Sequence, residues 1–369
     1  MSPIDPEGIG LREEPPPNHD LPATARAIGF DWVGVARAEP LREELENLRS
    51  WLAEGRHGSM AWLAREPERR ADPVRVLEDC RSVVVVGVNY LRSADWPHGA
   101  EPPLGFGVVS KYARTRDYHR VLEGMGRRLG RALSDRIAPG SEHRFLVDYG
   151  PVMERPWAVR AGLGFQGKHT LLIHPREGSF HFLGVLLTTA ELEPTAAVEE
   201  PMPDCGACRR CIDACPTGAI TEPHRLDARR CLSYLTIEHE GEVPEEFWPH
   251  FEGAVFGCDI CQDVCPYNRS RARPVAGESP LGAPVVAGLW SLSDLLAIRG
   301  EQLAAIPVAT PLRRAGADRL ARNAAIVAGE RGTREDLDAL RGLAADTTRP
   351  AWLRSVADRC ARRLEARLA

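Results

Sequence analysis

The sequence is poor in lysine, in aromatic residues and in long apolar runs. Only two of its 47 basic residues are lysines, and aromatic side chains make up 6% of the 369 residues. No stretch reaches the ~20 apolar residues that a membrane-spanning helix needs, and the N-terminus has neither an apolar leader nor a twin-arginine start. We therefore expect a cytoplasmic protein that does not bind membranes, and we do not expect its ten cysteines to form the disulfides of a secreted scaffold.

An overall excess of positive charge is also missing, which argues against a general nucleic-acid binder. The net charge is −5. The charge is unevenly distributed, because residues 311–369 contain thirteen arginines and eight acidic residues. This local net charge of +5 leaves −10 for the first 310 residues, so we expect an acidic body with a basic C-terminal segment.

Apolar periodicity divides the first half of the chain into a tail and a domain. Residues 1–20 have no such periodicity and are predicted to be a disordered tail. Between 21 and 195, helical patterns alternate with β-rich runs, which predicts an α/β domain around a buried sheet. The expected strands are 32–36, 82–88, 145–147 and 182–187, and residues 41–63 are expected to form a helix.

The second half is predicted to contain two further domains. Residues 196–275 hold eight of the ten cysteines and are expected to form a small ferredoxin-like domain. Residues 276–369 begin as a linker rich in proline and glycine and continue as helices. We expect one helix at 312–328, one capped by the segment from Thr333 to Asp336, and one opened by Pro350. Paired short helices of this kind look like helical-repeat units.

Cysteine spacing is the most specific signal in the sequence. Cys205-x2-Cys208-x2-Cys211-x3-Cys215-Pro216 has the spacing of bacterial ferredoxins, in which three thiolates hold one cubane and the fourth ligates a second cluster. Cys231 and then Cys258-x2-Cys261-x3-Cys265-Pro266 follow. The same rule assigns Cys205, Cys208, Cys211 and Cys265 to one [4Fe-4S] cluster, and Cys215, Cys231, Cys258 and Cys261 to the other.

Two other interpretations of these cysteines remain. Structural zinc also uses C-x2-C pairs, but it takes two pairs of ligands rather than a run of three followed by Cys-Pro. The clusters could also be structural staples, although two adjacent clusters favour electron transfer to a partner or an internal acceptor. Cys80 and Cys360 lie outside the pattern and are expected to be small buried hydrophobic residues.

The N-terminal domain should hold the acceptor of the electrons, yet it lacks the common nucleotide motifs. It has no G-x-G-x-x-G after a strand and no Walker sequence, and the chain has no D-x-H-x-x-G segment of a histidine-ligated corrinoid. Asp148 ends a short apolar strand, where chemistry is often found, although a turn or helix-cap aspartate is the plainer interpretation. Lys168 lies in a glycine-rich turn. As one of two lysines it can mark a site that needs a compact ammonium, or stand there by chance.

From about Leu21 to its end, the chain resembles the bacterial epoxyqueuosine reductases, cobalamin and iron–sulfur enzymes that complete queuosine on tRNA. The matching segments, besides the eight cysteines, are Gly58-Ser59-Met60, Glu68-Arg69-Arg70, Ser110-Lys111-Tyr112-Ala113, Asp117-Tyr118-His119, Asp148, Pro151-Val152-Met153-Glu154-Arg155, Gly164-Phe165-Gln166-Gly167-Lys168, Gly178-Ser179-Phe180, Phe182-Leu183-Gly184, Cys231-Leu232-Ser233-Tyr234-Leu235-Thr236 and Arg322-Asn323-Ala324-Ala325.

The resemblance implies a base-off cobalamin between the N-terminal domain and the ferredoxin-like domain, and a C-terminal HEAT-like module that helps to hold the tRNA anticodon stem-loop. It implies that Asp148 is the general acid, which requires a raised pKa. Residues implied near the corrinoid are Arg70, Ser110, Asp148, Leu172, Leu183 and Ser233. The arginines at 313, 314, 319 and 322 are expected to contact phosphates, with an ordinary solvated helix face as the alternative.

The chain departs from the family pattern at a few positions. His169 stands where asparagine is common, Glu252-Gly253-Ala254 stands where Gly-Asn-Arg is often found, and Glu238-His239-Glu240 is acidic for a loop facing RNA.

Alternative functions are a corrinoid reductive dehalogenase, a non-catalytic ferredoxin-type electron-transfer protein, and a tRNA-binding scaffold with vestigial clusters. The electron donor is unidentified, and nothing in the sequence demands more than a monomer.

Overall fold

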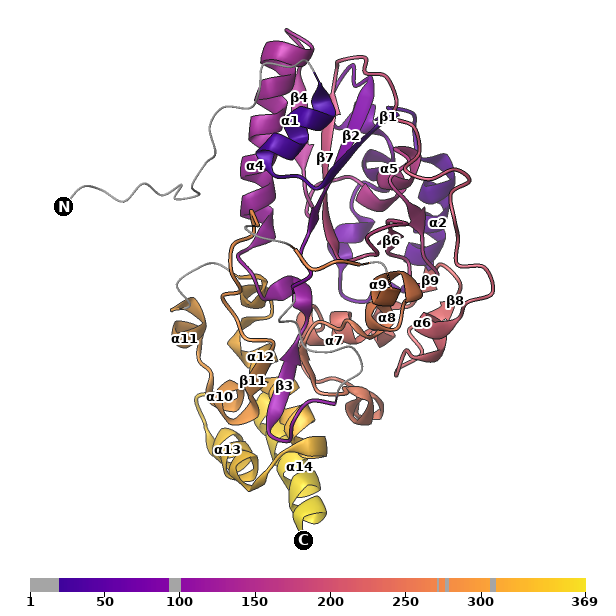
Figure 1. Ribbon diagram of the computed structural model, residues 1–369. Coiled ribbons are helices and arrows are strands. Elements are labelled where there is room, and N and C mark those ends of the chain that lie inside the picture. The colour runs from indigo at the N-terminus through magenta and orange to yellow at the C-terminus, as the bar shows by residue number, and fades with distance from the viewer. Residues whose placement is uncertain (1–19, 93–100, 271, 276–278, 306–309) are drawn as a thin grey trace, which may run out of the picture.

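The computed structural model describes residues 20–92, 101–270, 272–275, 279–305 and 310–369. The predicted N-terminal tail therefore lies outside the described residues, apart from its last residue. Figure 1 shows a sheet with helices on both faces, above a group of C-terminal helices. None of the helices in the described ranges is long and apolar enough to traverse a lipid bilayer.

The N-terminal domain is built on a four-stranded sheet in the order β1-β2-β7-β4. The strands are β1 (Trp32–Arg37), β2 (Ser82–Asn89), β4 (His143–Leu146) and β7 (His181–Thr188), which confirms the four predicted strands to within two residues. All three neighbouring pairs are antiparallel. This corrects the α/β expectation, because alternating helices and strands are typical of a parallel sheet.

The reason for the antiparallel pairing is the place of β7. Strands β2 and β4 each pair antiparallel with β7, so they run in the same direction, and the chain between them includes the long helix α4 (Tyr118–Ala132). This is a split βαβ arrangement. The later strand β7 fills the gap between β2 and β4, and the local sequence pattern of either strand gives no sign of it.

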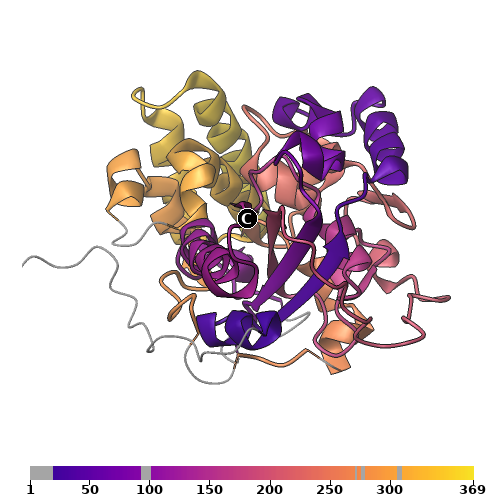
Figure 2. The ribbon, with the colours of Figure 1, turned by 90° about the horizontal axis from the view of Figure 1, so that it is seen from above.

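The sheet is covered on both faces, as the unbroken valine run of β2 predicts. All eight residues of β2 are buried. Helices α1 (Leu21–Ile28) and α4 pack with Val84 and Val86 on one face. Helix α5 (Glu154–Arg160) packs with Val83 and Val85 on the other face, where α2 (Arg42–Ala53) and α3 (Pro67–Ala71) also lie. Figure 2 shows the sheet from above, running between these two layers.

The helix predicted at 41–63 is shorter in the structure. Helix α2 spans Arg42–Ala53, and a single 3-10 turn at Ala61–Ala64 follows. The chain leaves the helix because Gly55 and Gly58 adopt the left-handed φ values of +66° and +59°. Glycine takes this conformation at little cost, and the apolar spacing alone did not reveal the break.

The cysteine-rich region consists of short elements that wrap around the thiols. They are α6 (Arg210–Asp213), β8 (Ile220–Glu222), β9 (Arg225–Leu226), α7 (Leu232–Ile237), β10 (Ala254–Phe256), α8 (Ile260–Asp263) and α9 (Pro266–Ser270). A small hairpin of the N-terminal domain, β5 (Phe165–Gln166) with β6 (Leu172–Ile173), carries the turn with Lys168.

The C-terminal helices agree with the sequence pattern. After β11 (Leu289–Ser291) come α10 (Leu292–Ala297), α11 (Gly300–Ala304), α12 (Gly316–Arg331), α13 (Arg334–Ala345) and α14 (Ala351–Leu368). The predicted cap of α13 is confirmed, since the Thr333 N–H donates to Asp336 Oδ2 at 2.7 Å. Pro350 directly precedes α14. Helices α12, α13 and α14 pack on one another.

The three expected domains share one sheet and one core. Strand β3 (Phe106–Val109) comes from the N-terminal part. It pairs in parallel with β10 of the cysteine-rich part and antiparallel with β11 of the C-terminal part. The largest apolar cluster likewise joins Trp248 and Phe256 to Leu320 and Leu353. Burying such side chains contributes about 1.5–3 kcal/mol each, so the parts are held together by a continuous apolar core.

Candidate active site and cysteine clusters

One group of four cysteines surrounds a small cavity. The cavity, of about 40 Å³, is lined by Cys205, Cys208, Cys211 and Cys265, together with His169 and Tyr267. Burial raises the pKa of Cys211 to about 11, and the neighbouring thiols add to this effect. Three of these cysteines come from one loop and Cys265 from the other, which is the grouping that the ferredoxin spacing predicts.

The other four cysteines form the second group. Burial raises the pKa values of Cys258 and Cys261, and negative charge on Cys231 and Cys215 would raise them further. Negative charge on Cys211 of the first group would also raise the pKa of Cys261. The two groups therefore lie side by side, as electron transfer between two clusters requires.

The cysteines are not gathered around single points. Among the described residues, no three His, Cys, Asp or Glu side chains are placed so that they could hold one metal ion. A cubane spreads its four thiolates over the corners of a cluster, so four cysteines around a cavity suit it better than they suit one zinc ion. All ten cysteines are free, and Cys80 and Cys360 are buried away from both groups, as predicted.

Each of the two lysines holds one cysteine loop. Lys168 Nζ donates to the backbone carbonyls of Gly206 and Cys208 at 2.6 and 2.9 Å. Lys111 is buried, and its Nζ lies 2.7 Å from Asp263 Oδ1 and 3.5 Å from Asp259 Oδ2, on the loop of the second group. A compact ammonium with several donors fits both places, and both lysines of the chain contact cysteine-bearing loops.

Asp148 stands at the end of the strand β4 segment, in a turn with a left-handed φ of +51°. Aspartate tolerates this conformation better than most residues. The Tyr118 hydroxyl donates to Asp148 Oδ2 at 2.7 Å, and His119 Nε2 lies 3.1 Å from the same oxygen. His119 Nδ1 lies 2.7 Å from Asp117 Oδ1. The carboxylate is thus fixed by the start of α4.

These contacts reverse the expected pKa of Asp148. Crowding by protein would raise it, but the hydrogen bonds from His119 and Tyr118 prevail and hold the pKa below its ordinary value. The side chain is 62% exposed, which weakens the effect of burial. Burial would lower the pKa of His119, but Asp117 and Asp148 raise it to about 9. The proton of this group therefore resides on His119 at neutral pH.

The sequence reasoning assigned no role to Glu154, a neighbour of Asp148. Burial raises the pKa of Glu154 to about 7, and the charge of Asp148 adds to the rise. Its Oε1 is buried without a hydrogen-bond partner among the described residues. Arg70 donates to Gly150 O at 3.4 Å, inside the Asp148 loop, and interacts with Glu154. Glu154 lies in a motif of the family resemblance, and that was the available signal.

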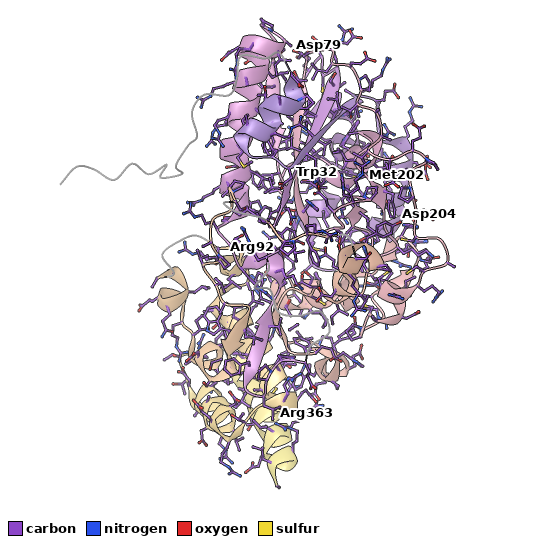
Figure 3. The ribbon with its side chains drawn as sticks, in the orientation of Figure 1. Trp32, Asp79, Arg92, Met202, Asp204 and Arg363 are labelled. Carbon is purple, nitrogen blue, oxygen red and sulfur yellow. The ribbon has the colours of Figure 1, made fainter. Side chains whose placement is uncertain are left out.

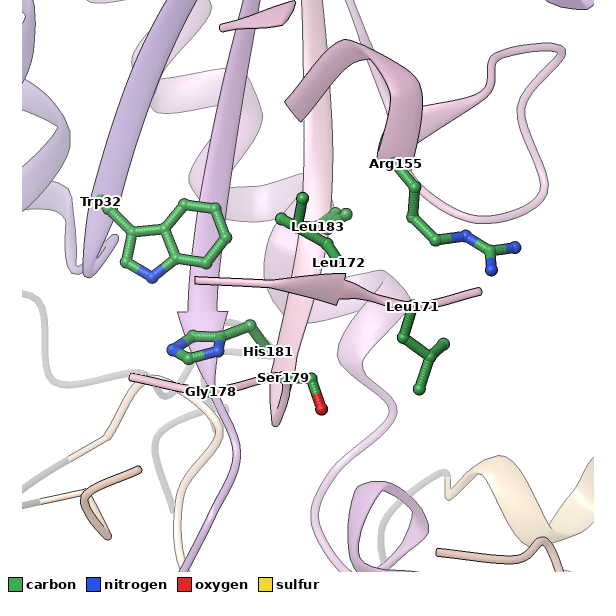
Figure 4. Close-up of a pocket in the computed structure, with 8 residues that line it drawn as sticks. All are labelled: Trp32, Arg155, Leu171, Leu172, Gly178, Ser179, His181 and Leu183. Atoms are coloured by element: carbon green, nitrogen blue, oxygen red, sulfur yellow. The ribbon is translucent and has the colours of Figure 1, made fainter. Parts of the chain in front are cut away.

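The residues predicted near the corrinoid do not all share one cavity. Leu172 and Leu183 lie together in a cavity of about 60 Å³ with Trp32, Arg155 and His181 (Figure 4). Ser110 lines a different cavity of about 420 Å³, beside Cys258 and Asp259. Ser233 lies two residues after Cys231, in the first turn of α7, and is half-buried.

The predicted RNA-binding arginines differ in their surroundings. Arg313 and Arg314 are exposed at the start of the C-terminal helices. Arg314 pairs with Glu238 and its guanidinium lies 5.1 Å from the ring centre of Trp62. Arg319 is half-buried and donates to the carbonyl oxygens of Arg314 and Glu238.

Arg322 cannot contact RNA, which corrects the prediction. It is 0% exposed, and its guanidinium donates to the carbonyl oxygens of Leu235, His239 and Gly241. It therefore fixes the loop after α7 from inside the core. The charge pattern suggested a phosphate contact because sequence does not show on which side of α12 the side chain lies.

The fold and the site together define a class of protein. A domain with a fixed, exposed carboxylate is joined through a shared core to eight cysteines in two adjacent groups with ferredoxin spacing. This is the arrangement of an iron–sulfur oxidoreductase with its own catalytic domain.

Comparisons with known proteins specify the family. A family described as "4Fe-4S double cluster binding domain" matches residues 204–268, and one described as "Epoxyqueuosine reductase QueG, DUF1730" matches residues 70–149. The chain is 39% identical to the epoxyqueuosine reductase of Escherichia coli K12 over 308 residues, which are 82% of this chain and 78% of the relative. It is 38% identical to that of Xanthomonas campestris, over 85% and 86% of the two chains. The chain belongs to the epoxyqueuosine reductase family.

Solved structures of that family share the whole fold. An epoxyqueuosine reductase crystallised with an epoxyqueuosine-modified tRNA-Tyr stem loop superposes with a TM-score of 0.83 at 27% identity, covering 93% of this chain and 89% of the other. The Streptococcus thermophilus enzyme gives 0.82 at 27% identity, with coverage of 94% and 90%. The Bacillus subtilis enzyme, solved with its catalytic aspartate loop swung out of the active site, gives 0.81 at 27% identity, with coverage of 93% and 89%.

Proposed function

We propose that this chain reduces epoxyqueuosine to queuosine in tRNA, with cobalamin at the active site and two [4Fe-4S] clusters as the internal electron path. Its relatives carry this activity in their names, and one of them binds an epoxyqueuosine-modified stem loop. The eight cysteines named above are the proposed cluster ligands, with the membership that the spacing predicts, and the cavity lined by Cys205, Cys208, Cys211 and Cys265 supports it.

One observation carries the proposal, namely a short aromatic path between Asp148 and the second cysteine group. Tyr118 donates a hydrogen bond to Asp148. The ring of Tyr112 lies 6.4 Å from that of Tyr118 and 6.2 Å from that of Phe256, two residues before Cys258. An acid and a reducing centre thus lie at the two ends of one continuous packed segment.

The residues present suit a cobalamin between the N-terminal domain and the cysteine-rich region. Ser110 Oγ is buried without a hydrogen-bond partner among the described residues, beside the cavity of about 420 Å³. We assign Arg70, Ser110, Leu172, Leu183 and Ser233 to its surroundings. When bound, cobalamin supplies a cobalt centre that takes single electrons from the clusters and gives two to the substrate.

The residues around Asp148 supply the proton for the leaving oxygen. Removal of the epoxide oxygen as water consumes two electrons and two protons and leaves an alkene. The Asp148 side chain is 62% exposed, so a substrate can reach it. His119 stores the proton 3.1 Å away, and Tyr118 orients the same carboxylate oxygen. A catalytic aspartate loop in the Bacillus subtilis relative supports this role for Asp148.

Replacement of Asp148 tests the proposal. We expect Asp148→Asn to lower turnover of an epoxyqueuosine-containing stem loop by about 10²–10⁴-fold, the usual contribution of a general acid. Visible spectra and iron content should show cobalamin and both clusters still bound. Asp79→Asn is the matched control, because Asp79 also has a positive φ but is exposed at the end of the molecule opposite the C-terminal helices (Figure 3). Unimpaired turnover, or loss of cobalamin in the Asp148 variant, would contradict the assigned role.

A further inference from the structure

His169 lines the cavity of the first cysteine group and is only 4% exposed. It follows Lys168, which holds the loop of the same group through the carbonyls of Gly206 and Cys208. A histidine is not needed as a ligand there, since four cysteines already line the cavity. Its presence among them calls for another explanation.

The hydrogen bonds of His169 determine which nitrogen carries the proton. The backbone N–H of Leu171 donates to His169 Nδ1 at 3.2 Å, so Nδ1 is an acceptor. A neutral imidazole then carries its single proton on Nε2.

The Nε2–H donor is buried and has no hydrogen-bond partner among the described residues. A buried donor without a partner costs about 1–3 kcal/mol, and native proteins seldom leave one. The ring lines the same cavity as four thiols, whose own sulfur atoms do not accept this hydrogen bond. An occupant with sulfur at its surface would satisfy the donor.

We propose that His169 Nε2–H donates a hydrogen bond to a sulfur of the cluster held by Cys205, Cys208, Cys211 and Cys265, and thereby raises the reduction potential of that cluster. The inference rests on the proposed function, because it needs a cluster in this cavity. A hydrogen bond to sulfur stabilises the added electron, and such bonds are among the determinants of cluster potential. His169 is a positioning and tuning residue and does not touch the substrate.

The test is a potentiometric titration of the reconstituted holoenzyme followed by electron paramagnetic resonance, without tRNA. In His169→Asn the side-chain oxygen can still accept from the Leu171 N–H, as asparagine does in turns, but the Nε2 donor is absent. We expect the reduced-to-oxidised ratio of the first cluster to fall about tenfold at a fixed potential, which is about 59 mV for one electron. The longer side chain in His169→Gln can place an amide N–H farther from the backbone than asparagine does. This variant should therefore recover most of the reduction potential that His169→Asn loses.

Two controls assign the effect. His224→Asn should change neither cluster, because His224 is exposed and lies beside Gly167 of the same turn without lining the cavity. The electron paramagnetic resonance signal of the first cluster is identified as the one that Cys208→Ser removes or shifts. An unchanged potential in His169→Asn, or a shift of the other cluster instead, overturns the inference. Absence of any cubane signal in the unaltered protein would refute the proposed function itself.

A second measurement covers the case in which the variants lose the cluster. Pulsed electron paramagnetic resonance of the unaltered protein, labelled with ¹⁵N only in histidine, should show a histidine nitrogen coupled to the reduced first cluster. The coupling should persist in His224→Asn. A spectrum without histidine coupling overturns the inference.

Discussion

Asp148 and His119 form an ion pair in which each residue sets the protonation of the other. The resemblance to reductases led us to expect a raised pKa for Asp148, whereas the structure shows a lowered one. The proton lies instead on His119, held between Asp117 and Asp148. A general acid at neutral pH therefore has to be understood as the pair, and not as the carboxyl group alone.

The pair predicts a titration that can be followed directly. In the folded protein the pKa of His119 is raised to about 9 from its ordinary 6.5. The contribution of protonated His119 to the free energy of unfolding is then fully present below about pH 6.5, and it is lost as the pH rises through about 9. We expect Asp148→Asn to lower the pKa of His119, because one of its two anionic partners is removed. NMR titration of ¹⁵N-histidine protein measures it. An unchanged value near 9, equal to that of Asp79→Asn, would contradict the pairing.

At the scale of elements, α12 acts from inside the protein rather than from its surface. Arg322 and Asn323 are both 0% exposed. Asn323 donates to the carbonyl oxygens of Thr236 and Val255, at 2.8 and 2.9 Å, so it joins α7 to β10. Arg322 closes the adjacent loop. The helix thereby fixes the chain that leads from Cys231 to Cys258, and it couples the C-terminal helices to the second cysteine group.

This role predicts a loss of stability in Arg322→Met. The variant leaves the carbonyl oxygens of Leu235, His239 and Gly241 buried without this donor, at about 1–3 kcal/mol for each unsatisfied group. We expect a clear fall in the thermal midpoint, measured by circular dichroism on cluster-loaded protein. Arg313→Met should stay within about 0.5 kcal/mol, since Arg313 is exposed. Equal midpoints for the two variants would show that Arg322 is not a core residue.

For the whole molecule, the separation of charge along the chain is partly offset by pairing in space. Arg359 contacts Glu242 and Glu245, Arg363 lies 4.0 Å from Glu245, and Arg314 contacts Glu238. Glu238, Glu242 and Glu245 belong to the acidic part of the sequence. The basic C-terminal segment therefore uses many of its arginines to attach itself to the cysteine-rich region, and fewer are available for phosphates.

Salt dependence of RNA binding tests this distinction. Each phosphate contact adds to the slope of log affinity against log salt, and removal of one basic contact lowers the slope by about 1. We expect Arg313→Gln to reduce the slope for an anticodon stem-loop by about 1. Arg363→Gln should leave it unchanged, because Arg363 lies 2.9 Å from Glu330 on the C-terminal helices. Fluorescence anisotropy at several salt concentrations gives both slopes, and equal slopes for the two variants would contradict the assignment.

Features that depend on local spacing could be predicted from the order of residues. Ligand spacing and Cys-Pro pairs predicted the grouping of the eight cysteines, because in the ferredoxin pattern three closely spaced thiolates hold one cluster and the cysteine before proline ligates the other. The valine run predicted a strand buried on both faces, and Thr333 with Asp336 predicted a helix cap. The signals for these features are short spacings and residue patterns, so they are present in the order of residues.

Features that depend on contacts between distant segments could be seen only in the three-dimensional fold. It inserted β7 between β2 and β4, turned Arg322 into the core, and set the pKa of Asp148 through His119, 29 residues away in the chain. It also placed His169 at the cavity of the first cysteine group. Burial and pKa depend on which groups approach in space, and local periodicity does not encode these long-range contacts.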